Sequence, residues 1–433
     1  MGDLTYLDGF GNHFATEAVP GALPQGQNSP QRCPYDLYAE QLSGTAFTVP
    51  RSGLQRSWLY KLRPSAAEQT EYQKHDNGHY LNNFGDFELV PTQLRWKAPE
   101  LPSADHAVDF VSGISTICGA GDPSVKTGIG MYTYVCNTSM THSAFYSADG
   151  DLLIVPQQGT LHLETEMGRL RVESKEIVVV PRGIKFAVKV DGQCRGYIAE
   201  VFSGHFKIPD LGPIGANGLA NPRDFKAPVA WYEDYEGPFT VIAKYCGQLF
   251  SYSLPYSVFD VVAWHGNYYP YKYDLRQFNV MNTVSYDHPD PSIFTVLTSA
   301  TTEAGVAALD FAIFPPRWMV GEHTFRPPYY HRNTMSEFMG NIAGTYDAKP
   351  GGFVPGGASL HVTMTAHGPE KTAFEQASIA ELKPVRYSDN DLAFMFETTY
   401  LLKVAPHALA RDKLDTEYLT CYAGFEKKFR RPA

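Results

Sequence analysis

The segment DLLIVPQQGTLHLETEMGRLRVESKEIVVVPRGIKFAVKV, residues 151–190, alternates apolar and polar residues and is divided at short intervals by Gly or Pro. A period of two places alternate side chains on opposite faces of a strand. Short strands at this spacing are typical of a β-sandwich or barrel. Because similar residues begin near Ser139, we predict a first β-module over about residues 139–190.

A second series of such segments runs from about Ser292 to Gly368, as SIFTVLTSA, AALDFAIFPP, NIAGTYDA and SLHVTMTAHG. The Gly-, Pro- and Asn-rich stretch between the two series, residues 211–237, is either a connector or a long functional loop. We therefore expect a mainly β fold with an N-terminal β-rich domain over residues 1–280 and a C-terminal domain over residues 281–433.

The remaining parts of the chain are less regular. Residues 1–110 show little periodicity and predict an ordered N-terminal arm, with short strands at TAFTV (45–49) and SWLYKLR (57–63). Helix is expected only in a few short elements. The best candidates are FEQASIAELK (374–383) and HALARDKLDTEYL (407–419).

Composition excludes several classes of protein. The chain has 36 Lys+Arg against 46 Asp+Glu, a net charge of −10, and no block of like charges, which argues against nucleic-acid binding. No apolar stretch approaches the ~18 residues of a membrane span, and the N-terminus does not resemble a secretory signal. The six cysteines contain no C-x-x-C pair. We expect a cytoplasmic protein without a disulfide framework.

Between Pro327 and Gly368 lie four residues that bind metals well, His331, Glu337, His361 and His367. His331 and Glu337 are six residues apart, an even spacing that puts both side chains on one face of a strand or of a strand-turn-strand. Two histidines and one carboxylate would form a facial triad that leaves positions open on a metal such as Fe(II). Ordinary histidines of a β-sheet core are the alternative.

The same residues resemble the metal motif of cupins, which are small β-barrels. His331, Glu337 and Gly344 follow its first part, with Asn333 in the place of a second histidine, and Pro355, Gly357 and His361 approach its second part. This template puts the second histidine ligand at His361. In the first module it places Phe186 and Leu152 at ligand positions, so we expect that barrel to be metal-free and structural.

Several longer strings are more specific. They include YLDGFGNHF (6–14), LYAEQLSGTAFTVPR (37–51), TFRPPYYHRN (324–333) and MSEFMG (335–340), and together they resemble the homogentisate 1,2-dioxygenase family from about residue 6 to about residue 375. The resemblance implies two cupin-like modules and a mononuclear non-haem Fe(II) enzyme of tyrosine and phenylalanine catabolism. Such an enzyme opens the ring of homogentisate with both atoms of O2 and forms maleylacetoacetate.

The resemblance also implies roles for individual residues. The iron ligands fall on His331, Glu337 and His367, so that His367 replaces His361 as the second histidine. The proton acceptor falls on His288, whose ordinary pKa of about 6.5 suits removal of a phenolic proton. Substrate contacts fall on Tyr346, on His367 and on His361.

Further expectations concern the surroundings of the site and the assembly. Arg332 and Asn333 either orient the ligands or reach across a subunit boundary, whereas a plain ion pair is the alternative for Arg332. Members of the family assemble as homohexamers of two stacked trimers, and the N-terminal arm suits subunit contacts. Two other functions stay open: a non-catalytic double cupin that binds a small ligand, and an iron dioxygenase for another phenolic acid such as gentisate.

Overall fold

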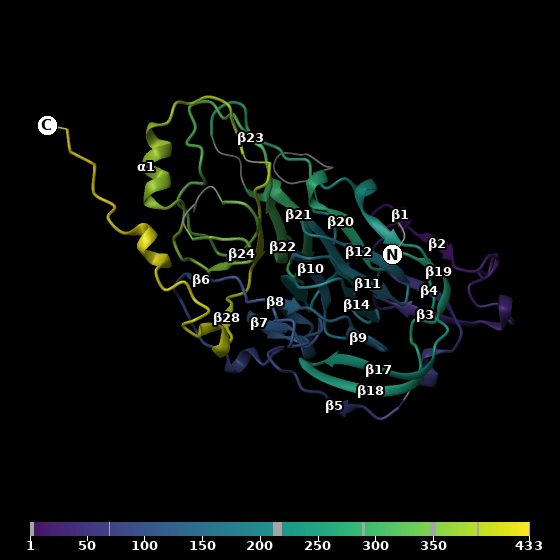
Figure 1. Ribbon diagram of the computed structural model, residues 1–433. Helices are drawn as coiled ribbons and strands as arrows, with labels where there is room; N and C mark the ends of the chain where they lie inside the picture. Colours follow the sequence, from purple (N-terminus) through teal and green to yellow (C-terminus); the bar gives the residue numbers. More distant parts are fainter. Residues whose placement is uncertain are drawn as a thin grey trace.

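The computed structural model describes residues 4–68, 70–210, 219–287, 291–346, 352–387 and 389–432. Figure 1 shows two groups of strands side by side, one built mainly from the first two thirds of the chain and one from the last third. We call them the first and second modules. The mainly β fold expected from the sequence is confirmed, and α1 (Lys371–Ile379) is the α-helix of the described residues. No helix among these residues is long and apolar enough to cross a lipid bilayer.

Short 3-10 helices connect many of the strands. In the described chain they span Pro34–Asp36, Arg51–Gly53, Ser65–Glu68, Phe84–Asp86, Pro123–Val125, Pro222–Asp224, Leu275–Gln277, Pro291–Phe294, Pro406–Leu409 and Tyr418–Tyr422.

Two sheets of the described residues build the first module. The larger has the order β1 (Tyr6–Asp8), β16 (Lys226–Pro228), β20 (Tyr271–Asp274), β13 (Glu176–Val180), β10 (Asp151–Gln158), β15 (Cys194–Val201), β8 (Thr127–Cys136), β7 (Ile114–Asp122) and β28 (Lys403–Val404). The other has the order β12 (Gly168–Val172), β11 (Leu161–Thr165), β14 (Phe186–Val190), β9 (Ser143–Ser147), β17 (Glu236–Tyr245), β18 (Gln248–Tyr256) and β5 (Gln73–Lys74). The strands predicted within residues 151–190 are therefore confirmed as β10 to β14.

The N-terminal arm contributes to a smaller sheet with the order β2 (Phe14–Glu17), β19 (Val261–Gly266), β4 (Arg56–Lys61) and β3 (Tyr38–Ser43). The strand predicted at 57–63 corresponds to β4, whereas the strand predicted at 45–49 is wrong. That segment is a turn, because the Thr45 hydroxyl accepts from the Gln55 amide at 3.1 Å and the Val49 amide bonds back to Ala46. Phe47 is then left 79% exposed.

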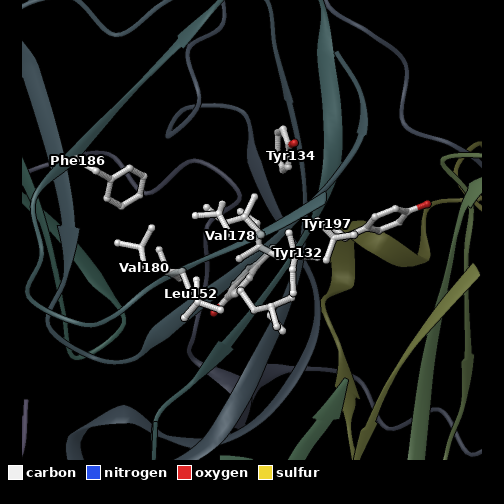
Figure 2. Close-up of a cluster of buried hydrophobic side chains, with 14 of the residues drawn as sticks. Tyr132, Tyr134, Leu152, Val178, Val180, Phe186 and Tyr197 are labelled. Carbon is white, nitrogen blue, oxygen red and sulfur yellow. The ribbon is translucent and has the colours of Figure 1, made fainter. Parts of the chain in front are cut away.

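Apolar side chains from both sheets fill one continuous core in the first module. Figure 2 shows Leu152, Val178 and Val180 gathered in this core, with Phe186 to one side, and the rings of Tyr132 and Tyr134 nearby. Leu152 and Phe186 are 1% and 0% exposed. The two positions at which the cupin template would place ligands thus pack as ordinary core residues, and a metal-free first barrel stays a prediction.

A buried charge cluster lies in the same module. The Lys244 ammonium contacts Asp149 at 2.6 Å and Glu200 at 3.0 Å, and all three side chains are at most 4% exposed. Glu200 also accepts from the hydroxyls of Tyr132 at 2.8 Å and Ser147 at 2.6 Å. Buried charges persist only when they are paired and hydrogen-bonded, so this cluster depends on all its members.

The second module centres on a sheet with the order β21 (Thr295–Ala300), β22 (Ala307–Phe314), β27 (Leu392–Thr398), β24 (Ser336–Ala343), β25 (Ala358–His361) and β6 (Leu94–Trp96). A short pair, β23 (Trp318–Met319) with β26 (Val385–Arg386), lies beside it. Of the second series of predicted strands, β21 and β22 agree, whereas NIAGTYDA contributes only the end of β24 and only the start of SLHVTMTAHG forms β25.

The two modules exchange strands. In Figure 1 the blue β6 lies with the green strands of the second module, and the yellow β28 lies beside β7 in the first. Tyr197 of β15 also crosses between them, since its single hydroxyl proton is shared between the carbonyls of Gly357 and Asn341, which lie 2.8 and 3.1 Å from the hydroxyl oxygen. The domain boundary near residue 280 stays a prediction, and strands cross it in both directions.

The helix predicted at 407–419 is wrong. The first of its two short 3-10 turns and the residues after it contact the segment around β6, where the Trp96 indole donates to the Ala408 carbonyl at 2.8 Å and the Lys97 amide donates to the Lys413 carbonyl. Tertiary pairing overrides the local helix propensity here. The other candidate, at 374–383, overlaps α1.

We predict that Lys244→Met lowers the free energy of unfolding by about 3–5 kcal/mol, because it leaves two buried carboxylates without their cation. Chemical denaturation of the wild type and the variant measures this loss. Lys383→Met is the matched control, since the Lys383 side chain is 67% exposed and should change stability by less than about 0.5 kcal/mol. An equal loss of unfolding free energy in both variants would contradict a stabilising role of the buried charge cluster.

A pH-dependent contribution comes from His205, whose Nδ1 contacts Asp151 at 2.8 Å and whose Nε2 contacts the Gly44 carbonyl at 2.7 Å. Burial lowers the pKa of His205, but the charge and hydrogen bond of Asp151 outweigh it and the pKa is raised. The contribution is therefore complete below about pH 6.5 and is lost as the pH rises through the folded-state pKa.

We accordingly expect His205→Gln to lower the melting temperature most near pH 6 and progressively less at higher pH. Thermal unfolding across a pH series checks this, with His106→Gln as the exposed control. A difference between wild type and His205→Gln that does not shrink above pH 6.5 would disprove the charged state.

Candidate metal centre

Strand β24 separates the core of the second module from a cavity. Its alternate residues Phe338 and Ile342 face the main core, while Glu337 and Met339 face the opposite side of the sheet. The neighbouring strand β27 alternates in the same way, with Phe394 and Phe396 in the core. The period of two therefore presents Glu337 to the cavity from a strand that its neighbours hold on both sides.

The two histidines come from loops that a backbone bridge holds together. The amide of His331 donates to the carbonyl of His367 and the amide of His367 donates back, both at 2.9 Å. This exchange is the hydrogen-bonded pair of an antiparallel ladder, and it fixes the two α-carbons about 5.5 Å apart. The imidazole centroids then lie 4.2 Å apart.

His331, Glu337 and His367 converge on one point. The Glu337 carboxylate receives His331 Nε2 on Oε1 at 3.3 Å and His367 Nε2 on Oε2 at 2.8 Å. One ligand atom from each residue lies within 4.8 Å of the others, and in the described parts of the chain no other group of His, Cys, Asp and Glu meets this condition. His361 lies outside this group.

Both histidines are oriented for metal binding by the same kind of contact. The Nδ1 of His331 lies 3.0 Å from the Tyr329 carbonyl, and the Nδ1 of His367 lies 2.8 Å from the Thr365 carbonyl. A carbonyl can only accept, so each Nδ1 carries a proton and each Nε2 faces the carboxylate. Each Nε2 can donate to Glu337 when it is protonated or bind a metal when it is not, and two imidazoles with one carboxylate fit an open divalent metal site.

The six-residue interval between His331 and Glu337 spans a backbone bridge, a short loop and the start of β24, so a single strand does not carry both residues. The intervening loop is held by Asn333, whose Oδ1 accepts from the Met335 amide at 2.7 Å. The Asn333 amide group donates to Glu337 Oε1 at 2.8 Å. Asn333 thus orients the carboxylate, which is one of the two roles expected for it from the sequence.

The electrostatics of Glu337 favour the anionic ligand. Burial raises the pKa of this carboxyl, but hydrogen bonds from His331, His361 and His367 outweigh burial and hold the pKa well below its ordinary value. For His331, the hydrogen bond to Glu337 raises the pKa against the effect of burial. The carboxylate is therefore charged at neutral pH without any contribution from a metal.

The triad lies in a cavity of about 410 Å³. Apolar and aromatic side chains form much of its wall, among them Phe294, Phe314, Met339, Met395 and Tyr346. The Tyr346 ring packs against Phe314 and Phe353, with centroids 5.7 and 6.1 Å apart. This predicted substrate contact thus lies in the cavity wall, and its role stays a prediction.

Two arginines bring positive charge to the cavity wall. Arg317 is 8% exposed and lies over the rings of Phe294 and Tyr387, at 5.2 and 4.7 Å from their centroids. Arg332, expected beside the ligands, also borders the cavity but is exposed. Arg317 was not singled out from the sequence, because its neighbours Pro316 and Trp318 give no sign of a cavity.

Glu397 is a second residue that sequence reasoning did not find. In the sheet register it stands directly opposite Glu337 on β27, so both carboxylates face the cavity. The alternation of LAFMFET (392–398) is the sequence feature that could have revealed it. Of the other predicted residues, His361 is 2% exposed and lines the cavity opposite Glu337 on β25, with Nδ1 3.6 Å from Oε2. His288 lies outside the described residues.

Comparisons with known proteins were made on the whole chain. The family model described as homogentisate 1,2-dioxygenase N-terminal matches residues 5–275, and the one described as homogentisate 1,2-dioxygenase C-terminal matches residues 276–429. The solved structure of the protein Ylba from E. coli matches with 8% sequence identity and a TM-score of 0.30, and the match covers 72% of this chain and 93% of that chain. No conclusion is drawn from a match at that TM-score.

Curated relatives are similar over nearly their full length. The homogentisate 1,2-dioxygenase of Dictyostelium discoideum is 56% identical, with 98% of each chain covered. That of Caenorhabditis elegans is 54% identical, with 99% of each chain covered. The human enzyme is 53% identical, with all of this chain and 99% of the relative covered. Two family models and these relatives together span almost every residue, and the chain belongs to the homogentisate 1,2-dioxygenase family.

Proposed function

We propose that this protein is a dioxygenase that uses Fe(II) and O2 to open the ring of homogentisate and so form maleylacetoacetate, within tyrosine and phenylalanine catabolism. The observation that carries the proposal is the convergence of His331, Glu337 and His367 on one point of a cavity, in a chain of this family. Three protein ligands leave positions on the metal for a substrate and for O2.

Iron is proposed over zinc because of the ligand set. A structural zinc would use four protein ligands, commonly with thiolates, whereas two imidazoles and a carboxylate make the open site of non-haem Fe(II) oxygenases. When bound, Fe(II) would supply Lewis acidity and a path for electrons between an aromatic substrate and O2.

The protein's own residues have separate proposed tasks. The carbonyls that accept the Nδ1 protons of His331 and His367 turn both Nε2 atoms towards the metal position, and Asn333 holds Glu337 Oε1. The apolar wall around Tyr346 would exclude water from an aromatic ring, with Tyr346 and His361 as further substrate contacts. His288 would accept the proton of a substrate hydroxyl, as the resemblance implies.

The charge of the cavity suits an acidic phenol. Homogentisate carries a carboxylate at neutral pH, and Arg317 offers a nearly buried guanidinium in the wall, the group that proteins use to bind carboxylates. The apolar wall suits the ring. A gentisate dioxygenase would need the same two features, so substrate comparison separates these candidates.

We further propose that the protein works as a homohexamer of two stacked trimers in the cytoplasm. The assembly is implied by the family resemblance, and light scattering of the purified protein tests it. The proposed compartment is supported by the cysteines, all six of which are free thiols.

We predict that protein stripped of metal and reloaded anaerobically binds one Fe(II) per chain and then consumes one O2 per homogentisate. An oxygen electrode with homogentisate and with gentisate measures the rates, and homogentisate should be turned over faster. Lack of oxygen uptake with homogentisate by iron-replete protein would refute the proposed reaction. A chain that holds no stoichiometric metal on elemental analysis would instead support the non-catalytic double cupin.

Glu337→Ala should abolish stoichiometric iron binding and lower activity by more than ~100-fold. Replacing a residue that only supports a metal ligand typically lowers metal affinity or activity by about 10–100-fold. Replacing the ligand that both histidines face should therefore lower them further. Glu375→Ala, on the exposed side of α1, is the matched carboxylate control and should keep iron and activity. Thermal unfolding verifies that both variants fold. A Glu337→Ala protein that keeps iron and activity would disprove the ligand assignment.

A further inference from the structure

A chain of buried side chains begins at His361, which lines the cavity beside Glu337. Its Nε2 is 2.8 Å from the hydroxyl of Tyr418. That hydroxyl donates to Gln93 Oε1 at 3.1 Å, and Gln93 Nε2 donates to the carbonyl of Ala366 at 2.6 Å. His361, Tyr418 and Gln93 are 2%, 3% and 7% exposed. We call this chain the Gln93–Tyr418 relay.

The orientation of the Gln93 amide follows from the far end of the relay. The Ala366 carbonyl can only accept, so the Gln93 amide must turn its NH2 group towards it and its oxygen towards Tyr418. The Tyr418 hydroxyl can then donate to that oxygen. The same hydroxyl contacts His361 Nε2 at 2.8 Å and is also hydrogen-bonded to Tyr422.

The contact with Tyr418 sets which nitrogen His361 turns to the metal centre. With Nε2 facing the relay, Nδ1 faces Glu337 Oε2 at 3.6 Å. The same carboxylate oxygen lies 2.8 Å from His367 Nε2. The His361 ring stacks on the His367 ring, with centroids 4.1 Å apart and planes inclined by 16°. The His361 ring thus packs directly against one member of the triad and lies beside another.

The relay connects segments that are distant in the sequence. Gln93 immediately precedes β6, Tyr418 lies in the C-terminal 3-10 helix, and Ala366 immediately precedes His367. The C-terminal segment is held in place by Arg95, which lies 4.1 Å above the Tyr418 ring and forms an ion pair with Asp415 at 3.4 Å. Both ends of the relay therefore reach the triad, one through the backbone beside His367 and one through His361.

We propose that Gln93 and Tyr418 are positioning residues of the metal centre, which hold the His361 ring against His367 and hold the backbone beside His367 in place. The inference rests on the proposed metal site. It gives the C-terminal segment and the start of β6 a part in assembling a site to which they contribute no ligand. Partners of this kind typically change metal affinity by ~10–100-fold when they are removed.

The main test is Tyr418→Phe, which deletes one hydroxyl and keeps the ring under Arg95. Metal affinity is measured anaerobically by competition with a chelator, with Fe(II) and with Co(II) as a redox-inert probe. We expect Tyr418→Phe to bind both metals ~10–100-fold more weakly and to shift the visible absorption bands of bound Co(II). Tyr269→Phe is the control, because it loses a comparable hydroxyl contact, with the Asn12 carbonyl at 3.0 Å, in the first module.

Two further variants keep the proposal falsifiable if Tyr418→Phe folds poorly. Gln93→Glu retains an acceptor for Tyr418 but loses the donor to Ala366, and it should weaken metal binding while Tyr418 is intact. In a His361→Ala background, Tyr418→Phe should cause little additional loss, because the hydroxyl acts through His361. Fully additive losses would indicate a general structural effect and would overturn the proposal.

The outcomes distinguish this inference from the proposed function. Wild-type protein that binds no metal overturns the metal site and the inference together. Wild-type protein that binds Fe(II) and consumes O2 with homogentisate, beside a Tyr418→Phe protein with unchanged affinity and Co(II) spectrum, overturns the inference alone. Equal weakening in Tyr418→Phe and Tyr269→Phe also overturns it.

Discussion

The carboxylate of Glu337 is the point on which the arrangement of the second module depends. An anion that is 5% exposed must be met by hydrogen-bond donors or by a cation, and both of its oxygens are used. The backbone bridge of His331 with His367 brings the two imidazoles to it from loops. The register of β24 with β25 brings His361. Four elements of the module are therefore arranged around one charged group.

That constraint extends into the first module through the sheet that carries Glu337. One face of β24 and β27 belongs to the same apolar core as β8, β10 and β15, whereas the other face forms the cavity wall. The exchange of β6 and β28 and the Tyr197 contact tie the two modules further. A densely packed core transmits strain, so the first module supports the geometry of the site although it contributes no ligand to it.

The distribution of charge is more informative than the total. The net charge of −10 describes the surface, while the interior holds paired groups such as Lys244 with Glu200 and Asp149. In the cavity wall, the positive charges of Arg317 and Arg332 balance the negative charges of Glu337 and Glu397. A bound divalent metal would tip this local balance to positive, which suits an anionic substrate in an otherwise acidic protein.

The sequence by itself determined the mainly β fold, because period-two alternation such as that of residues 151–190 reports directly which face of a strand is buried. It also determined the three candidate ligands, since their residue types and family-specific strings are local features. Only the tertiary structure decided how they meet. The His331–His367 bridge, the register that sets Glu397 opposite Glu337, and the contacts of Gln93 and Tyr418 join residues far apart in the chain. Local pattern carries no information about such pairings, because they depend on which strands become neighbours, and the failed helix at 407–419 has the same cause.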